Sequence, residues 1–246
     1  MVEQDALPAR GEPLPVGPLP AVGWRAVQEA ARRHGYAVCH GRPVDWGRHP
    51  GPGARELLGP DWSRYCAARE PLVRARLLGS RLLLRHTVAA AAGVEPDRVV
   101  LGRDRRGRPV LHEPPGLDVA ISHTAGMLVV GAARGRLIGV DVEVSDRPLL
   151  TPGLADRFCH PRELADLSGL PPAERNQRLV RLWTLKEAYT KAHGVGLAWD
   201  FARLRPRPGP HGDGWWSLEA APGWRLRCDR VAGRFLVAAA LGPDGL

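Results

Sequence analysis

The sequence contains few cysteines and no long apolar run. The cysteines lie far apart and form no CxxC pair, which argues against a zinc or redox motif, so we expect four free thiols: Cys39, Cys66, Cys159 and Cys228. No apolar run approaches the roughly 20 residues of a membrane-spanning helix. The first 20 residues hold five prolines but no basic region followed by an apolar run. We therefore expect a cytoplasmic protein with a flexible lead-in over residues 1–20 and no membrane segment.

Several common nucleotide-binding and catalytic motifs are also missing. The chain has neither the GxxxxGK[ST] phosphate loop nor the GxGxxG dinucleotide loop. It has no GxSxG nucleophile elbow, which argues against a serine hydrolase. His112-Glu113 is followed by prolines and so does not belong to a zinc-protease helix. No recognisable DNA- or RNA-binding signature occurs.

Lysine is scarce in a strongly basic chain. The formal net charge is +9, yet the only lysines are Lys186 and Lys191, and arginine supplies the other basic residues. A basic surface suits nucleic acid, a phosphorylated cofactor or an acidic protein partner. Biased codon usage explains the arginine excess equally well. The scarcity makes the two lysines informative, because they lie within six residues of each other.

The pattern of apolar residues predicts a mixture of helices and strands. A chain of 246 residues, 44% of them hydrophobic, corresponds to one large or two small soluble domains. Helical spacing predicts two long helices, Leu72 to Ala92 and Pro172 to His193, and shorter ones at Trp24 to Arg33 and Glu163 to Leu167. We expect loops over Arg42 to Gly53 and Pro206 to Gly214, which are rich in proline and glycine.

Short β-type runs lie between and after these helices. They are Tyr36 to His40, Val99 to Leu101, Val119 to Ser122, Met127 to Ala133, Leu137 to Val144, Trp215 to Glu219, Trp224 to Arg230 and Phe235 to Leu241. The order of helix, strands, helix and strands suggests two similar halves.

Three acidic residues lie in patterns that suit chemistry. Asp141 and Glu143 alternate along a strand-like segment, so their side chains point to the same face. Two neighbouring carboxylates repel each other, so they lie either at a solvated sheet edge or around a cation. Glu187 and Lys191 are four residues apart on a helix, a spacing that also gives an ordinary surface ion pair.

A histidine at the end of an apolar strand is a further candidate. His123 follows Ser122 where a turn begins, and such places often hold site residues. Ser122 and Thr124 beside it offer hydroxyl groups. A lone histidine is nevertheless more often structural than functional.

Four segments together resemble the motifs of Sfp-type 4′-phosphopantetheinyl transferases, in order and in spacing. They are Gly107-Arg108-Pro109, Ile121-Ser122-His123-Thr124, Gly139-Val140-Asp141-Val142-Glu143 and Trp183-Thr184-Leu185-Lys186-Glu187-Ala188-Tyr189-Thr190-Lys191. The resemblance covers residues 57–205. It implies an α+β fold made of a pseudo-twofold pair of similar subdomains, each a small antiparallel sheet packed on a long helix. The subdomains would comprise residues 21–137 and 138–246, with the site for coenzyme A and Mg²⁺ in the cleft between them.

The resemblance also implies a reaction. The enzyme would transfer the 4′-phosphopantetheine group of coenzyme A to a serine of an apo acyl or peptidyl carrier protein, with release of adenosine 3′,5′-bisphosphate. Phosphoryl transfer depends mainly on positioning and charge neutralisation. Mg²⁺ binds carboxylate oxygens and phosphate oxygens, which gives the acids a use. Carboxylates alone do not decide between Mg²⁺ and Mn²⁺.

Roles for individual residues follow from the same resemblance. The metal ligands would be Asp141, Glu143 and Glu187, and Glu187 would also be the general base. His123 and Lys191 would neutralise the leaving group. The residues that contact coenzyme A would be Arg76, Arg108, Ser122, His123, Lys186 and Lys191. Family lysines that reach the 3′-phosphate are absent at the comparable place, where Arg64 or Arg69 is the candidate substitute.

Other functions stay open at this stage. A scaffold that binds coenzyme A or a carrier without catalysis would keep the fold, although the complete set of acids argues against it. A nucleic-acid-binding protein would explain the basic charge, but its arginines should cluster on one face and here they are spread along the chain. The two-halves form that the resemblance implies suggests a monomer. The carrier could belong to polyketide, nonribosomal peptide, fatty acid or lysine metabolism.

Overall fold

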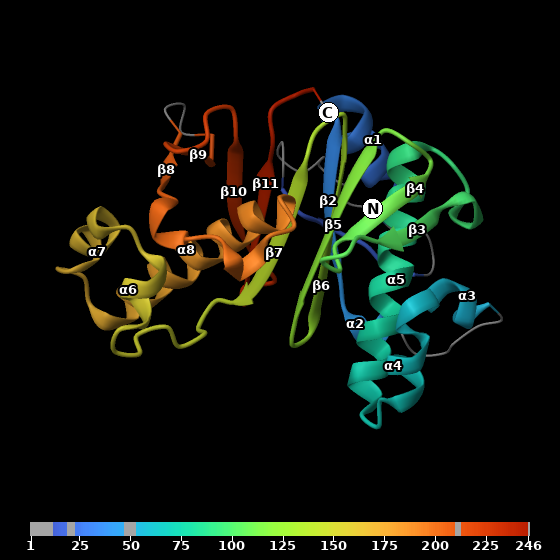
Figure 1. The fold of residues 1–246 in the computed structure, drawn as a ribbon, viewed down its shortest axis with the longest axis horizontal. Coiled ribbons are helices and arrows are strands. Elements are labelled where there is room, and N and C mark those ends of the chain that lie inside the picture. Colours follow the sequence, from blue (N-terminus) through green and yellow to red (C-terminus); the bar gives the residue numbers. More distant parts are fainter. Residues whose placement is uncertain (1–11, 19–22, 47–52, 210–212, 246) are drawn as a thin grey trace, which may run out of the picture.

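Two β-sheets lie side by side, and each is covered by one long helix (Figure 1). The computed structural model describes residues 12–18, 23–46, 53–209 and 213–245. No helix in these ranges is long and apolar enough to cross a membrane. All four cysteines are free thiols, as expected, and Cys66 is the exposed one.

The first sheet is formed by residues of the N-terminal half. Its strand order is β1-β2-β6-β5, with β1 (Leu14–Pro15), β2 (Tyr36–Gly41), β5 (Leu117–Thr124) and β6 (Met127–Arg134). Within the described residues of this sheet, the β1–β2 pair is parallel and the β2–β6 and β5–β6 pairs are antiparallel. Two helices, α1 (Trp24–His34) and α5 (Pro71–Ala92), pack against it through a core that includes Val27, Leu84, Val88 and Val130.

The second sheet is antiparallel and belongs to the C-terminal half. Its strand order is β7-β11-β10-β9-β8, with β7 (Ile138–Val144), β8 (Pro206–Pro208), β9 (Trp215–Leu218), β10 (Arg225–Val231) and β11 (Phe235–Leu241). The helix α8 (Pro172–Ala192) packs on β7 and β11, and α6 (Leu154–Phe158) and α7 (Pro161–Leu167) lie beyond it (Figure 1). Leu179, Leu185 and Leu226 lie in its core.

The two halves repeat one topology, which confirms the predicted fold class. In each half a strand is followed by a long helix and then by a β-hairpin. The last strand of that hairpin pairs with the first strand of the half, which gives the orders β2-β6-β5 and β7-β11-β10. This arrangement brings the long helices α5 and α8, the strand β5 and the strand β7 around one central region (Figure 1).

The ends of the two long helices follow from proline and glycine. Each helix has a proline in its first turn, Pro71 in α5 and Pro172 in α8, where no intrahelical hydrogen-bond donor is needed. Gly93 ends α5 in a left-handed conformation with φ of 73° and donates to Ala89 O. Each helix therefore begins at a proline and continues through apolar residues at helical spacing, as the sequence predicts.

The close contact of α8 with β7 depends on a glycine. A Cβ atom added to Gly139 would lie 1.9 Å from Ala188 O and 2.6 Å from Ala192 N. Only a residue without a side chain allows the helix backbone to approach the strand this closely. Glu187 adjoins Ala188 and Lys191 adjoins Ala192 on this helix, so Gly139 helps to bring both side chains to the strand that carries Asp141.

The structure corrects several expectations about loops. The expected loop at residues 42–53 contains α2 (Pro43–Trp46), the expected loop at 206–214 contains β8, and β1 lies within the expected lead-in, of which residues 1–11, 19 and 20 lie outside the described ranges. Such segments are too short to show a period. They gain structure from their neighbours: Leu14 and Trp46 are both buried in the core beside α5.

The N-terminal half contains further short elements. They are α3 (Ala54–Leu58), α4 (Trp62–Ala67) and the hairpin β3 (Val100–Arg103) and β4 (Pro109–Glu113). Single 3₁₀ turns lie at Gly59–Asp61, Pro96–Arg98, Gly196–Ala198 and Phe201–Arg203.

Candidate active site

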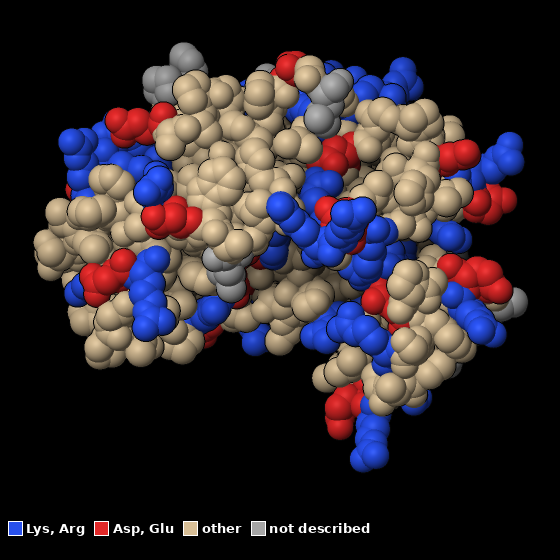
Figure 2. Space-filling model, in the orientation of Figure 1, with Lys and Arg blue, Asp and Glu red and all other residues tan. Residues whose placement is uncertain are grey.

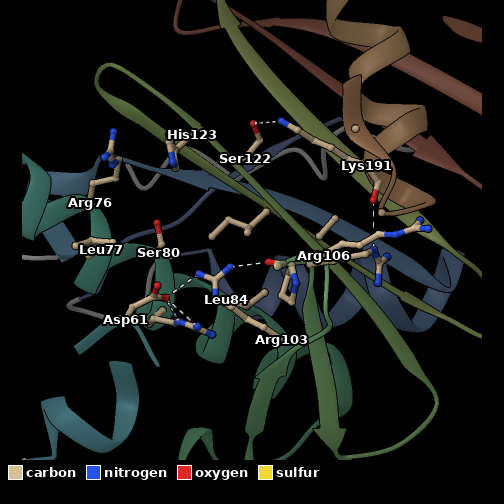
Figure 3. Close-up of a pocket in the computed structure, with 18 of the residues that line it drawn as sticks. Asp61, Arg76, Leu77, Ser80, Leu84, Arg103, Arg106, Ser122, His123 and Lys191 are labelled. Carbon is tan, nitrogen blue, oxygen red and sulfur yellow. Dashed lines mark hydrogen bonds and ion pairs between the residues drawn. The ribbon is translucent and has the colours of Figure 1, made fainter. Parts of the chain in front are cut away.

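A cavity of about 430 Å³ lies between the two halves (Figure 3). Its walls come from α5, the β3–β4 hairpin, β5 and the end of α8. Most of its charged lining residues are basic: Arg64, Arg76, Arg81, Arg103, Arg106, Arg108 and Lys191. Asp61 is the single acid among the described residues that line it. Basic side chains also gather around the hollow between the halves in Figure 2. A cavity of this charge favours an anionic ligand.

Lys191, Ser122 and Asp141 form one connected cluster at the edge of this cavity. The Lys191 ammonium donates to Asp141 Oδ1 over 2.5 Å and to Ser122 Oγ over 2.9 Å. Ser122 Oγ in turn donates to Asp141 Oδ1 over 2.9 Å. Burial alone would lower the pKa of Lys191, but the attraction of Asp141, Glu187 and Glu143 outweighs it and raises that pKa. Lys191 is therefore a fixed positive charge that joins α8, β5 and β7.

Glu187 lies on the same face of α8, one turn before Lys191. Its side chain is buried, and among the described residues no hydrogen bond or ion pair engages its carboxylate. Burial, followed by repulsion from Asp141, raises the pKa of Glu187 to about 7. This carboxyl can thus hold or release a proton near neutral pH.

Glu143 is held differently from the other two acids. Its carboxylate accepts from Trp183 Nε1 over 3.1 Å and forms an ion pair with Arg147, whose guanidinium also lies 5.1 Å from the centre of the Trp183 ring. Burial and the nearby Asp141 raise the pKa of Glu143. All three expected acids therefore lie close enough to affect one another electrostatically.

His123 and Arg76 lie next to each other at one end of the cavity (Figure 3). Burial and the nearby Arg76 lower the pKa of His123. The imidazole is therefore neutral at physiological pH and can donate one hydrogen bond and accept another. Ser122 of the same strand and Lys191 at the end of α8 also line the cavity. Together with Arg108, five of the expected residues share it.

Arg108 lines the cavity, but most of its donors are already used. Its guanidinium forms a bidentate pair with Asp118, at 2.8 and 2.5 Å, and also donates to Lys191 O and Ile138 O. These contacts tie the β3–β4 hairpin to the end of α8. Four of its five N–H groups are engaged in these contacts, which gives Arg108 a bracing role. Its expected contact with phosphate stays a prediction.

Lys186 does not belong to the cavity, contrary to the sequence-based expectation. Its ammonium is fully buried and donates to Glu163 Oε2 over 2.6 Å and to Phe158 O over 2.8 Å. Adjacent residues on an α-helix point about 100° apart. Glu187 faces the strand pair, so Lys186 turns toward α6 and α7 and is out of reach of a phosphate in the cavity.

The acids offer oxygen atoms to a cation without being arranged around one. Among the described residues, no group of three or more histidine, cysteine or acidic side chains is placed to hold a metal ion. Within the described part of the chain, Asp141 Oδ2 is buried without a hydrogen-bond partner, and no hydrogen bond or ion pair engages the Glu187 carboxylate. Carboxylate oxygens left in this way fit a hard divalent cation such as Mg²⁺. In this structure the positive charge beside these acids comes from Lys191, which pairs with Asp141, and from Arg147, which pairs with Glu143.

Part of the cavity carries no signal in the sequence. Asp61, Arg81 and Arg103 meet there, although they are isolated residues of three different elements. No motif or period marks them, so only the fold reveals the cluster. Of the two arginines considered as substitutes for the missing lysines, Arg64 lines the cavity and Arg69 is not among its lining residues.

Two family profiles together match most of this chain. A family profile described as the 4′-phosphopantetheinyl transferase superfamily matches residues 137–240, and one described as 4′-phosphopantetheinyl transferase, N-terminal, matches residues 63–136. The two matches are contiguous and meet between β6 and β7.

Individual relatives agree with these profiles. The 4′-phosphopantetheinyl transferase HetI of Nostoc sp. is 32% identical over 163 residues, which cover 63% of this chain and 66% of that protein. A 4′-phosphopantetheinyl transferase of Bacillus subtilis is 32% identical over 126 residues, or 50% of this chain and 54% of that protein. The matches therefore span between about half and just under two thirds of these relatives' length.

A solved structure also matches part of the chain. It is a holo-(acyl-carrier-protein) synthase from Bacillus anthracis in complex with CoA (3′,5′-ADP), with 22% identity and a TM-score of 0.37, and the match covers 43% of this chain and 93% of that chain. This likeness is too low to support a conclusion.

Proposed function

Because the chain belongs to the 4′-phosphopantetheinyl transferase superfamily, we propose that it transfers the 4′-phosphopantetheine group of coenzyme A to a serine of an apo acyl or peptidyl carrier protein. The second product is adenosine 3′,5′-bisphosphate. Coenzyme A occupies the arginine-rich cavity between two subdomains, residues 21–137 and 138–246. The protein acts as a cytoplasmic monomer.

One observation carries this proposal. Lys191, Ser122 and Asp141 form a hydrogen-bonded cluster, with Glu187 beside it, at the edge of a cavity lined by arginines. Coenzyme A carries several phosphate charges, and a basic cavity suits them. The cluster supplies a fixed cation and carboxylates next to that cavity. This is the set of groups that a phosphoryl transfer to a hydroxyl needs.

The chain's own residues neutralise charge on the pyrophosphate. The carrier serine oxygen attacks the phosphorus that bears pantetheine, and the bond from that phosphorus to the bridging oxygen of the nucleotide breaks. Negative charge grows on the departing phosphate. Lys191, whose pKa is raised, stays protonated and donates to its oxygens, and neutral His123 donates a further hydrogen bond.

The acidic residues would bind the metal and accept the proton of the carrier serine. Asp141, Glu143 and Glu187 would hold Mg²⁺, which would supply further neutralisation of the pyrophosphate charge when bound. Glu187 receives the proton of the carrier serine, directly or through water. In the metal-free protein, burial and the nearby Asp141 raise its pKa to about 7. Arg147 and Lys191 balance the charge of these acids when no metal is bound.

A basic rim around the cavity suits the carrier protein as well. The net charge is +9, and Lys and Arg side chains surround the hollow between the halves (Figure 2). Complementary charge on an acidic partner accelerates encounter and aligns it. An acidic carrier domain would therefore be drawn toward the hollow in which its serine must react.

The experiment that tests this proposal is an intact-mass measurement on an apo carrier protein. The carrier is incubated with this protein, coenzyme A and Mg²⁺, and in parallel with EDTA. We expect the carrier to gain one phosphopantetheine arm with Mg²⁺ and not with EDTA. A carrier whose reactive serine is replaced by alanine serves as the control and should keep its mass.

A titration of the protein with coenzyme A separates the remaining outcomes. Binding of coenzyme A without modification of several acyl and peptidyl carriers would indicate a scaffold instead of an enzyme. Absence of both binding and modification would contradict the proposed function.

A further inference from the structure

Asp61 is an acid in the wall of a cavity suited to anions. It is 5% exposed and lies at the end of the 3₁₀ turn Gly59–Asp61. An acid in this place repels an anionic ligand, so it weakens binding if charge alone decides the affinity. Its presence therefore calls for a reason other than charge.

The carboxylate of Asp61 is the meeting point of three guanidinium groups. Asp61 Oδ2 accepts from Arg81 Nη2 over 2.9 Å, from Arg81 Nε over 3.2 Å and from Arg103 Nη2 over 2.7 Å. Asp61 Oδ1 accepts from Arg64 Nη1 over 3.4 Å. Figure 3 shows Asp61 near Arg103 on one side of the cavity, with Ser122 and Lys191 on the other. All three arginines line the cavity.

The three arginines differ in what else they do. Arg81 is buried, so Asp61 is needed to balance its charge. Arg103 is one-third exposed and also donates to Gly107 O over 2.7 Å, inside the β3–β4 hairpin. Asp61 therefore ties this hairpin, with Arg106 and Arg108 in it, to α5. Arg103 and Arg64 keep further N–H groups for a ligand.

We propose that Asp61 is a positioning residue for the anionic substrate. It holds Arg103, Arg64 and the β3–β4 hairpin in place, so that their free donors meet the phosphate groups of coenzyme A without prior rearrangement. This inference rests on the proposed function, because coenzyme A is the anion concerned. The gain in affinity comes from arginines fixed before binding, which lose less freedom when the ligand arrives.

The direction in which a single substitution changes the affinity for coenzyme A distinguishes positioning from charge. Asp61→Asn removes a negative charge from the cavity while keeping the size of the side chain. If the cavity acts through charge alone, this variant binds coenzyme A more tightly than the wild type does. If Asp61 positions the arginines, the variant binds more weakly in spite of the more favourable charge.

The test is a calorimetric titration of the full chain with coenzyme A. We expect Asp61→Asn to raise the Kd about tenfold or more, as when outer partners of ligand-holding side chains are removed. The KM for the carrier should stay within about twofold of the wild type. Glu174→Gln, which breaks the exposed Glu174–Arg178 pair on α8, is the matched control and should leave both values unchanged.

A second variant covers the risk that Asp61→Asn does not fold because Arg81 loses its buried partner. Asp61→Asn combined with Arg81→Met removes both buried charges, and it should fold and still show the raised Kd. An unchanged or lower Kd in whichever variant folds would overturn the inference. The wild-type protein is the control for this comparison. If it binds coenzyme A and modifies a carrier, an unchanged or lower Kd in the variant contradicts the role of Asp61 and leaves the proposed function standing.

Discussion

The ammonium of Lys191 on α8 lies 2.5 Å from Asp141 Oδ1 on β7. This contact joins a residue of a helix to a residue of a strand, and the two residues are 50 apart in sequence. The pair also contacts Ser122 of β5, which belongs to the other half of the molecule. The functional cluster is therefore assembled from both halves and depends on how closely α8 and β7 approach each other.

Replacing Lys191 by methionine should remove most of the transfer activity. Methionine has a similar length but no charge, so the developing charge on the leaving phosphate loses its donor. Loss of one such donor costs about 10²–10³ in turnover. The rate of carrier modification at saturating coenzyme A measures the effect.

Lys191→Arg is the matched variant for this prediction. It keeps the charge and should retain more activity than Lys191→Met. A methionine variant with the wild-type rate would contradict the role of Lys191 in charge neutralisation.

The metal-free protein should lose stability as the pH rises from about 4.5 to 7. The pKa of Glu187 is raised from 4.5 to about 7, mainly by burial and then by Asp141. In this range the folded state keeps a proton that the unfolded state has lost, so the linkage favours unfolding as the pH increases. The loss is on the order of 3 kcal/mol for this one group. Urea denaturation in EDTA at several pH values measures it.

Glu187→Gln provides the control for the pH dependence. This variant has no titrating group at position 187, so its stability should change less between pH 5 and pH 8. Identical pH profiles for the variant and the wild type would show that folding does not change the pKa of the Glu187 carboxyl.

Replacing Lys186 by methionine should reduce stability and leave the affinity for coenzyme A almost unchanged. The Lys186–Glu163 ion pair is buried, and removing one partner leaves an uncompensated charge, at a cost of about 3–5 kcal/mol. Urea denaturation and a titration with coenzyme A measure the two quantities separately.

The double variant Lys186→Met with Glu163→Gln should recover part of this loss, because both charges are then gone. The amide oxygen introduced by Glu163→Gln can still accept from His160 N, as the Glu163 carboxylate does at the start of α7. A large rise in the Kd for coenzyme A with unchanged stability would instead support the phosphate-binding role that the sequence motif suggested.

Gly139→Ala should disturb the cluster without touching any of its side chains. The added Cβ would lie 1.9 Å from Ala188 O, so α8 must move away from β7. Overpacking of this kind costs about 1–3 kcal/mol or more. Lys191 and Glu187 would move with the helix, so we expect both a lower midpoint of urea denaturation and a lower transfer rate.

Gly169→Ala is the matched control, because an added Cβ at Gly169 has no neighbour within 4 Å and its φ is not in the left-handed region. It should keep the stability and activity of the wild type. Equal behaviour of the two variants would show that the close approach of α8 to β7 is not required.

The sequence predicts the repeated helices and strands well because their signals are local. Both long helices carry apolar residues at helical spacing between a proline and a glycine, and the main strands alternate or are continuously apolar. The strands β1 and β8 and the helix α2 were missed, since a segment of two to four residues has no period and forms only where neighbouring elements cover it.

The candidate site was predictable in part for a similar reason. Ser122, His123, Asp141 and Lys191 lie in motifs, and the structure places them together around one cavity edge. Lys186 was misplaced because a motif gives the order of residues and not the direction in which each helix position points. Asp61 and Arg103 are 42 residues apart and carry no motif, so their contact follows only from the tertiary fold.

The most direct test of the central claim compares carrier modification by the wild type, Asp141→Asn and Glu187→Gln. An apo carrier protein is incubated with each protein, coenzyme A and Mg²⁺, and its intact mass is followed with time. We predict one phosphopantetheine arm on the carrier with the wild type and a rate reduced at least about a hundredfold in both variants. Modification by the variants at the wild-type rate, or no modification by a wild type that binds coenzyme A, would contradict the account.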